Sequence, residues 1–271
     1  MTASCVRAKV RYLNSKWRDS EELARIGDRD SRRANTTPTH VDIFDVRPQN
    51  ARGELDLDTN GFLLSELHSA VMDFRDEEEV KSTYYSEVQS LVKELAGADH
   101  VFMMQHLVRT EAKDSFNTAY ARFIHCDYSS HDVSSMARRM LERYELDPAL
   151  SDQWDFAWFN TWQPFEREVQ QNPLTVIDAT SLEEADVVDY YYTGYGKDGR
   201  SSIPMFNANH RFCYFPRMQT GEVMIFKQLD TRAGVAQMCP HTSFDDNTAP
   251  ADALGRRSIE TRMMCAFERR A

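Results

Sequence analysis

The sequence is 271 residues long, which suits one large domain that buries a sizeable core without disulfides. A hydrophobic fraction of 41% and an aromatic fraction of 11% exclude an intrinsically disordered chain, and no run approaches the ~18 apolar residues of a membrane helix. The formal net charge is −11 with lysines and arginines scattered, which argues against a nucleic-acid-binding protein.

The cysteines and the N-terminus predict where the protein works. The five cysteines are an odd number and no two form a CxxC pair, which is typical of a reducing, cytoplasmic environment. The first residues lack the apolar stretch of a secretory signal. We therefore expect a cytoplasmic protein with a small-molecule substrate and no nucleic-acid or membrane partner, while a homodimer stays open.

The N-terminal part of the chain is polar and then helical. Residues 1–60 carry few periodic signals, although 41–46 alternates loosely and predicts an edge strand. Residues 66–96 have apolar positions at helical spacing, and Gly97 is placed to end that helix. An apolar run at 101–109 predicts a strand.

The C-terminal part is mostly short strands. Residues 122–129 read as a strand, 130–146 as a helix, and 190–204 as a long loop. Further strands are predicted at 156–164, 174–178, 210–216, 222–229, 234–238 and 258–267. Helices followed by a series of antiparallel strands predict an α+β fold: a double-stranded β-helix, or cupin-like jelly roll, with flanking helices.

One pair of residues in this strand region carries metal chemistry. His125 and Asp127 are two apart, so on a strand both side chains leave the same face. An imidazole and a carboxylate aimed at one point are two of the three ligands in the facial triad that holds non-haem Fe(II). The third ligand must be a histidine from a distant strand, and His210 and His241 qualify. We favour His241, because it follows Pro240 at a strand end, where a barrel opens.

A carboxylate clamp is available downstream of His241. Three ligands on one face of an octahedral ion leave three positions, two for a chelating 2-oxoacid and one for dioxygen. The far carboxylate of the 2-oxoacid needs a planar cation, which arginine provides best. Arg256, Ser258, Glu260 and Arg262 share one face if 256–262 is a strand, and Arg256 with Ser258 offers a fork and a hydroxyl to one carboxylate.

Two other interpretations remain at this point. Residues 256–262 also fit a solvated, charged strand end. A cupin-like metal-binding protein or isomerase that uses no dioxygen fits the metal ligands too, but it would not need the arginines downstream of His241.

The chain resembles the fungal hydroxylase/desaturase group typified by the AsaB and CmcJ proteins, within the Fe(II)/2-oxoglutarate-dependent oxygenase superfamily. Several motifs in the same order carry the resemblance, at residues 55–62, 73–80, 125–129, 160–164, 207–216, 222–227, 240–244 and 256–262. One departure is Trp162-Gln163-Pro164, where the family usually has Trp-Arg-Pro.

The resemblance implies one oxygenase domain over 1–271, in which residues 1–100 pack on a jelly-roll core, 101–271, that carries the iron site. The implied cofactors are Fe(II), 2-oxoglutarate and dioxygen. The implied iron ligands and catalytic residues are His125, Asp127 and His241, with 2-oxoglutarate held by Arg256 and Ser258 and with Arg262 in reserve.

The substrate side of the site is less specified. Candidate substrate contacts are Asn160, Asn207, His210 and Lys227, and Lys227 could instead snorkel or pair with a buried anion. Halogenases of this class carry a small residue in place of the carboxylate, so Asp127 implies hydroxylation, desaturation or oxidative ring closure at an unactivated C–H bond of a secondary metabolite. The residues do not choose among these outcomes, because the choice depends on substrate placement.

Overall fold

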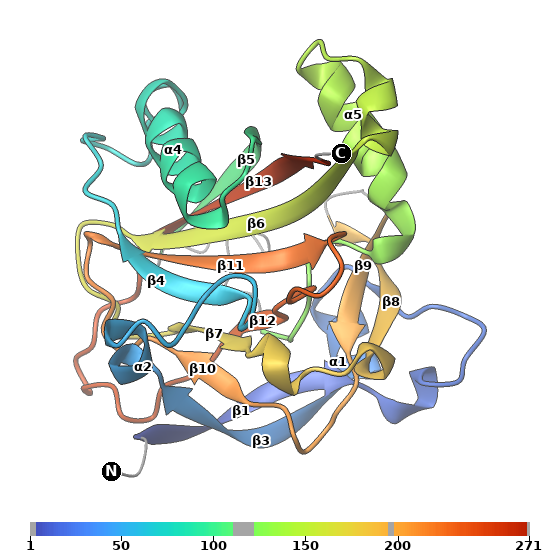
Figure 1. Cartoon of the computed structure of the whole chain (residues 1–271). Helices are drawn as coiled ribbons and strands as arrows, with labels where there is room; N and C mark the ends of the chain where they lie inside the picture. Colours follow the sequence, from blue (N-terminus) through green and yellow to red (C-terminus); the bar gives the residue numbers. More distant parts are fainter. Residues whose placement is uncertain (1–3, 111–121, 195–197, 270–271) are drawn as a thin grey trace.

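Two five-stranded β-sheets organise the computed structural model, which describes residues 4–110, 122–194 and 198–269 (Figure 1). The β6 sheet has the strand order β4 (Phe62–Glu66), β11 (Glu222–Asp230), β6 (Trp154–Pro164), β13 (Ser258–Glu268) and β5 (His100–Arg109). The β7 sheet has the order β1 (Cys5–Leu13), β3 (Thr36–Asp45), β10 (Phe212–Tyr214), β7 (Leu174–Ile177) and β12 (His241–Ser243). A third, smaller sheet contains β2 (Arg25–Ile26), β8 (Val187–Tyr192) and β9 (Gly199–Pro204).

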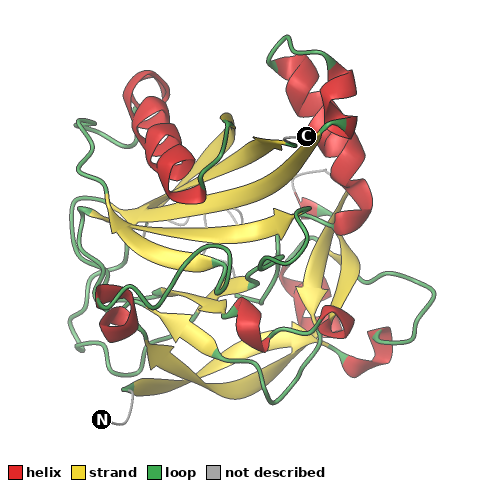
Figure 2. Ribbon diagram, viewed as in Figure 1, coloured by secondary structure: helices red, strands yellow, loops and turns green. Residues whose placement is uncertain are grey.

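Helices lie outside the sheets (Figure 2). The α-helices are α1 (Arg29–Asn35), α2 (Arg47–Ala51), α3 (Glu77–Glu79), α4 (Tyr85–Ala96) and α5 (Val133–Arg143), and a π-helical turn (Val80–Tyr84) joins α3 to α4. Short 3-10 turns occur at Ser15–Trp17, Ser130–Asp132, Pro148–Asp152, Ala179–Ser181 and Glu184–Asp186. No helix among the described residues is long and apolar enough to cross a membrane.

The helix before β5 covers one face of the β6 sheet. Val80, Tyr84, Val88 and Val92 recur every four residues, so they form one apolar stripe, and all four are fully buried. They pack on the β6 sheet in the same cluster as Phe159. Because neighbouring strand residues point to opposite faces, Trp158 and Asn160 on β6 face away from this helix.

The opposite face of the β6 sheet packs on the β7 sheet. Trp162 and Phe226 from the β6 sheet share one buried cluster with Leu174, Val176 and Cys213 from the β7 sheet. His241, one of the candidate metal ligands, borders this core, because it pairs with Val176 and its ring centroid lies 5.0 Å from that of Phe226.

Most predicted strands are present. Six of the predicted strands correspond to β5, β6, β7, β10, β11 and β13, and the helix predicted at 130–146 corresponds to a 3-10 turn followed by α5. Gly97 ends α4 in the left-handed conformation with φ 62°, as predicted. The helix predicted from residue 66 begins only after Asp76, whose side chain accepts the backbone N–H groups of Glu78 and Glu79 and caps the first turn.

Three predictions were wrong: the loop at 190–204, the edge position of the strand at 41–46, and the strand at 234–238. Residues 190–204 are not one loop, because β8 and β9 pair there as antiparallel strands whose polar and aromatic residues concealed the pattern. β3 is not an edge strand, because it lies between β1 and β10, and Pro38 is tolerated inside it where β10 does not reach. No strand is assigned at 234–238, where a loop leads to β12.

The first hundred residues do more than pack on the sheets. β1 and β3 belong to the β7 sheet, and β4 and β5 to the β6 sheet. β1 was not predicted, although it alternates the apolar Val6, Ala8 and Val10 with the charged Arg7, Lys9 and Arg11, a pattern typical of a half-buried strand.

Candidate metal centre

The segment Ile124–Asp127 is held by four different parts of the fold. Its successive backbone N–H groups donate to Arg11 O in β1 (3.0 Å), His241 O in β12 (3.1 Å), Ser202 O in β9 (2.8 Å) and the Gln228 side chain in β11 (2.9 Å). The predicted strand at 122–129 is therefore reduced to isolated bridges at His125 and Cys126. The side chains of His125 and Asp127 nevertheless converge, because each backbone step is fixed by a separate partner.

Three side chains that could each donate a ligand atom to a metal, here called the donor residues, meet at this segment: His125, Asp127 and His241. One ligand atom each from His125, Asp127 and His241 lies within 4.8 Å of the other two. His125 and His241 form a backbone pair, and their ring centroids are 4.4 Å apart. His241, rather than His210, thus joins the pair predicted from the sequence.

Hydrogen bonding and burial leave the two imidazoles ready to act as neutral ligands. His125 Nδ1 lies 2.9 Å from the Phe123 carbonyl, which can only accept, so Nε2 carries the free lone pair and lies 3.7 Å from Asp127 Oδ1. Burial, reinforced by neighbouring His125, lowers the pKa of His241 to about 3. His241 is therefore uncharged at neutral pH, and its Nδ1 has no hydrogen-bond partner among the described residues.

Two residues orient the Asp127 carboxylate. Arg262 Nη2 lies 2.8 Å from Oδ1, and Asn160 Nδ2 donates to Oδ2 at 2.6 Å. Asn160 and Arg262 are register partners on β6 and β13, so one cross-strand pair holds both carboxylate oxygens. Burial raises the pKa of Asp127, but the Arg262 charge and the two histidines outweigh burial and hold the pKa at about 2.

Arg262 also pairs with a second buried carboxylate. Its Nη2 lies 2.8 Å from Glu260 Oε1, and Glu260 is 5% exposed. Sequence reasoning placed Glu260 on this face but gave it no role. The alternation of charged residues in an otherwise apolar strand was the available signal.

Arg256 and Ser258 lie further along the same strand region. The Arg256 guanidinium lies 5.0 Å from the Trp162 ring centroid, and its Nη1 donates to the Asn172 carbonyl. The Ser258 hydroxyl is buried and has no hydrogen-bond partner within the part of the chain that the structure describes. Arg256 and Arg262 therefore differ among the described contacts, because Arg262 pairs with the carboxylate of Asp127 and Arg256 lies on the Trp162 ring.

Two of the four predicted substrate contacts belong to another buried network. His210 Nδ1 lies 2.9 Å from Tyr12 Oη and its Nε2 3.1 Å from Asp186 Oδ2, and Asn207 Nδ2 donates to the same Asp186 oxygen. These contacts tie β1 to the turn before β8, and they involve none of the three donor residues. Asn207 and His210 do not reach the candidate metal ligands because both bind the carboxylate of Asp186 instead.

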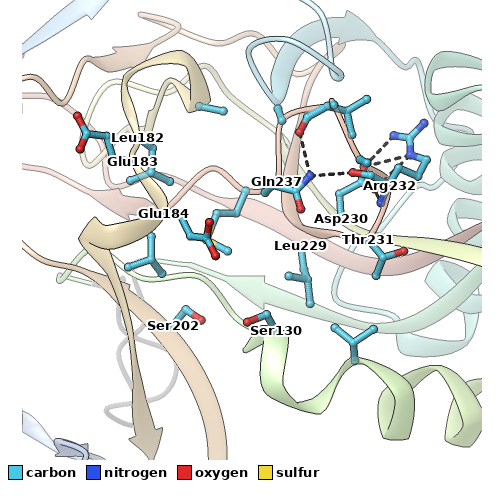
Figure 3. A pocket seen from close by; sticks show the side chains of 18 of the residues that line it. Ser130, Leu182, Glu183, Glu184, Ser202, Leu229, Asp230, Thr231, Arg232 and Gln237 are labelled. Carbon is cyan, nitrogen blue, oxygen red and sulfur yellow. Dashed lines mark hydrogen bonds and ion pairs between the residues drawn. The ribbon is translucent and has the colours of Figure 1, made fainter.

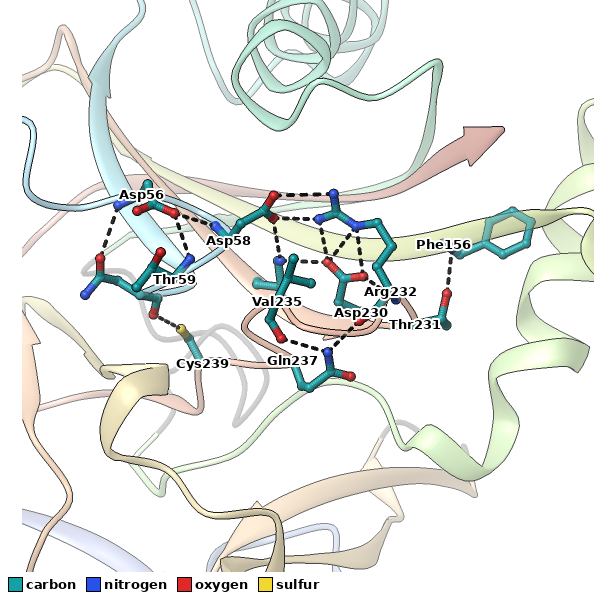
Figure 4. Close-up of polar contacts among 12 residues, drawn as sticks. Asp56, Asp58, Thr59, Phe156, Asp230, Thr231, Arg232, Val235, Gln237 and Cys239 are labelled. Carbon is teal, nitrogen blue, oxygen red and sulfur yellow. Dashed lines mark hydrogen bonds and ion pairs between the residues drawn. The ribbon is translucent and has the colours of Figure 1, made fainter. Parts of the chain in front are cut away.

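Lys227, the third predicted contact, is fully buried and ion-paired. Its Nζ lies 2.6 Å from Asp230 Oδ2 and 3.1 Å from Asp58 Oδ1. Figure 4 shows Asp58 and Asp230 beside Arg232, which pairs with both. Lys227 is thus paired with the buried Asp230 and the exposed Asp58, and of the four predicted contacts only Asn160 lies beside His125, Asp127 and His241.

A cavity of about 830 Å³ lies near the segment Ile124–Asp127, although none of His125, Asp127 and His241 lines it (Figure 3). Its lining comes from the start of α5, the turn before β8, β9 and the loop after β11, and includes Ser130, Leu229 and Gln237. Ser202 also lines it, and the Ser202 backbone pairs with Cys126, between the two donor residues. Cys126 itself is buried, and burial raises the pKa of its thiol well above the ordinary value.

Comparisons with known proteins place the chain among oxidoreductases. A family model described as "Oxidoreductase/YMDC permease-like domain" matches residues 10–266. The chain is 30% identical over 261 residues to the hydroxylase/desaturase efuI of Hormonema carpetanum, covering 86% of this chain and 85% of the relative. It is 29% identical over 239 residues to the Fe(II)/2-oxoglutarate-dependent dioxygenase nvfI of Aspergillus novofumigatus, covering 85% and 84%.

The fold has a solved counterpart. A structure of the iron and alpha-ketoglutarate-dependent endoperoxidase NvfI superposes with a TM-score of 0.87 at 24% sequence identity, covering 99% of this chain and all of that chain. The two chains therefore share their fold over nearly their whole length.

Proposed function

The chain belongs to the oxidoreductase family that contains the fungal hydroxylases/desaturases and Fe(II)/2-oxoglutarate-dependent dioxygenases, and we propose that it oxidises an unactivated C–H bond of a small secondary metabolite. The reaction consumes dioxygen and converts 2-oxoglutarate to succinate. Its outcome is hydroxylation, desaturation or oxidative cyclisation.

The convergence of His125, Asp127 and His241 carries this proposal. Two neutral imidazoles and one carboxylate are the donor set of the facial triad in non-haem Fe(II) oxygenases. When bound, Fe(II) supplies the redox chemistry that couples decarboxylation of 2-oxoglutarate to oxidation of a C–H bond. The protein's own contribution is to hold the carboxylate through Arg262 and Asn160 and to keep His241 neutral by burial.

Arg256 and Ser258 are the proposed anchor for the far carboxylate of 2-oxoglutarate. The planar Arg256 guanidinium lies over the Trp162 ring and can bind a carboxylate with two hydrogen bonds. The buried Ser258 hydroxyl lacks a partner among the described residues and can donate to the same carboxylate. Arg262 is unsuited, because Asp127 and Glu260 already neutralise it.

The fold and the neighbouring cavity support the same function. The β6 and β7 sheets are the proposed halves of a double-stranded β-helix that forms a single oxygenase domain. The cavity of about 830 Å³ is in the size range of small-molecule pockets, and its lining mixes hydroxyl and carboxylate groups with apolar side chains. The proposed partner is accordingly a small organic molecule.

Succinate formation tests the proposal. Purified protein with Fe(II), 2-oxoglutarate and dioxygen should release succinate, and His125→Ala and His241→Ala should abolish the release together with Fe(II) binding. His100→Ala is the matched control, because this partly exposed histidine pairs with Glu268 at the far end of β5 and should retain both properties. Metal binding without any dependence on 2-oxoglutarate or dioxygen would favour the isomerase alternative instead.

A further inference from the structure

Gln228 occupies an irregular position in β11. Lys227 pairs with Phe159 of β6 and Leu229 pairs with Trp158, so Gln228 is an extra residue without a partner on that strand. Such β-bulges turn a side chain out of its regular direction and are common beside active sites. Gln228 is fully buried, so its polar groups must find partners inside the protein.

The Gln228 amide forms hydrogen bonds with the backbone of Asp127 and with the backbone of Cys239, two residues before His241. Its Oε1 accepts the Asp127 N–H at 2.9 Å, and its Nε2 lies 3.2 Å from both the Lys227 and the Cys239 carbonyl oxygens. The amide orientation is fixed by its neighbours, because an N–H can only donate and a carbonyl can only accept. Only a side chain with one acceptor and two donors satisfies all three groups.

These contacts connect two ligand-bearing segments that are far apart in the sequence. Asp127 is itself a candidate metal ligand, and Cys239 precedes Pro240 and the candidate ligand His241. Pro240 restricts the backbone between Cys239 and His241, and the Pro240 carbonyl is fixed by the Ile177 N–H at 2.9 Å. Fixing the Cys239 carbonyl therefore limits where the His241 side chain can lie.

We propose that Gln228 is a positioning residue for the metal centre, which helps to set the spacing between Asp127 and His241 by bridging the backbones of Asp127 and Cys239. The inference rests on the proposed function, since it concerns the same three donors. Arg262 and Asn160 hold the carboxylate of Asp127, whereas Gln228 holds its backbone and ties that backbone to the segment of His241.

A pair of glutamine variants tests this role. Gln228→Met keeps the length of the side chain and removes all three hydrogen bonds. Gln163→Met is the matched control, because Gln163 is also buried, accepts from Tyr84 Oη at 2.7 Å and donates to the Leu67 and Thr220 carbonyls. Both variants should lower the melting temperature by similar amounts, so a difference in metal binding reports position and not stability.

Co(II) serves as the probe, by anaerobic titration followed through its visible absorption. Gln228→Met should raise the Kd for Co(II) by about 10–100-fold and change the absorption bands, as expected when a group that orients a ligand is removed. Gln163→Met should leave the Kd within about twofold of the wild type and the bands unchanged. Equal Co(II) affinity and spectra in the wild type and Gln228→Met, or an equal weakening in both variants, would overturn the proposal.

A second variant covers the case in which Gln228→Met does not fold. Gln228→Glu keeps the acceptor for the Asp127 N–H but faces the Cys239 carbonyl without a donor, so it should also weaken Co(II) binding and alter the spectrum. An unchanged Kd in Gln228→Glu refutes the bridge. Failure of the wild type to bind Co(II) would instead contradict the proposed function itself, and the inference with it.

Discussion

Ser258→Ala should separate cofactor binding from stability. The Ser258 hydroxyl is buried and lacks a partner among the described residues, so its removal takes away an unsatisfied polar group. We expect the free energy of unfolding to stay within about 1 kcal/mol of the wild type. If the hydroxyl donates to the carboxylate of 2-oxoglutarate, the variant loses a hydrogen bond to a charged group, worth about 1.5–3 kcal/mol, which raises the Kd by about 10–150-fold.

The assay is calorimetric titration of 2-oxoglutarate into Mn(II)-loaded protein, combined with urea unfolding. Thr261→Val is the control on the same strand, because the Thr261 hydroxyl faces the other side of the sheet and bonds the Thr161 hydroxyl. It should lower stability by about 1 kcal/mol and leave 2-oxoglutarate affinity unchanged. A Ser258→Ala protein that binds 2-oxoglutarate as tightly as the wild type would refute the assignment.

Three further predictions follow from the charged groups. Arg256→Lys should raise the Kd of 2-oxoglutarate about 10–100-fold without changing metal affinity, because lysine keeps the charge but loses the planar fork and the stacking on Trp162; calorimetry of the Mn(II)-loaded protein measures it. Arg262→Met should cost about 3–5 kcal/mol in urea unfolding of the metal-free protein, since two buried carboxylates lose their shared cation, and a loss below ~1 kcal/mol would contradict this. Burial raises the pKa of Glu222, but the Arg47 fork outweighs burial and lowers that pKa below its ordinary 4.5. The stabilisation is present above the unfolded-state pKa and is lost as the pH falls through the folded-state pKa, so Glu222→Gln should flatten the loss of stability between about pH 5 and 3 in urea titrations.

The donor residues could be predicted from the sequence because their chemistry is local. His125 and Asp127 are two residues apart, and period-2 geometry already places them on one face. The sequence favours His241 over His210 because it predicts a strand end at His241; the structure does bring His241 to the pair, but no strand ends there and His241 begins β12. The competing partner of His210, Asp186, lies in a segment that carried no recognisable pattern, so its buried network could not be foreseen.

The surrounding contacts could not be predicted, since they depend on register between distant strands. Arg256 and Arg262 lie on one face of the same strand region, yet one stacks on Trp162 and the other pairs with Asp127. Arg262 lies within β13 opposite Asn160, whereas Arg256 precedes β13 and has no register partner on β6. The bulge at Gln228 is equally invisible in a continuous apolar run, although a glutamine in such a run is a signal for a buried polar contact.

The way Ile124–Asp127 is anchored also decides when the metal centre can form. Its four backbone partners belong to β1, β9, β11 and β12, and all four strands are distant in the sequence from residues 124–127. Pairings between such distant segments form slowly, because closing a long loop lowers the chain entropy before any contact compensates for that loss. The donor set therefore exists only after all four strands have docked. We therefore expect the complete set of three candidate ligands, His125, Asp127 and His241, to be available to a metal only in the folded protein.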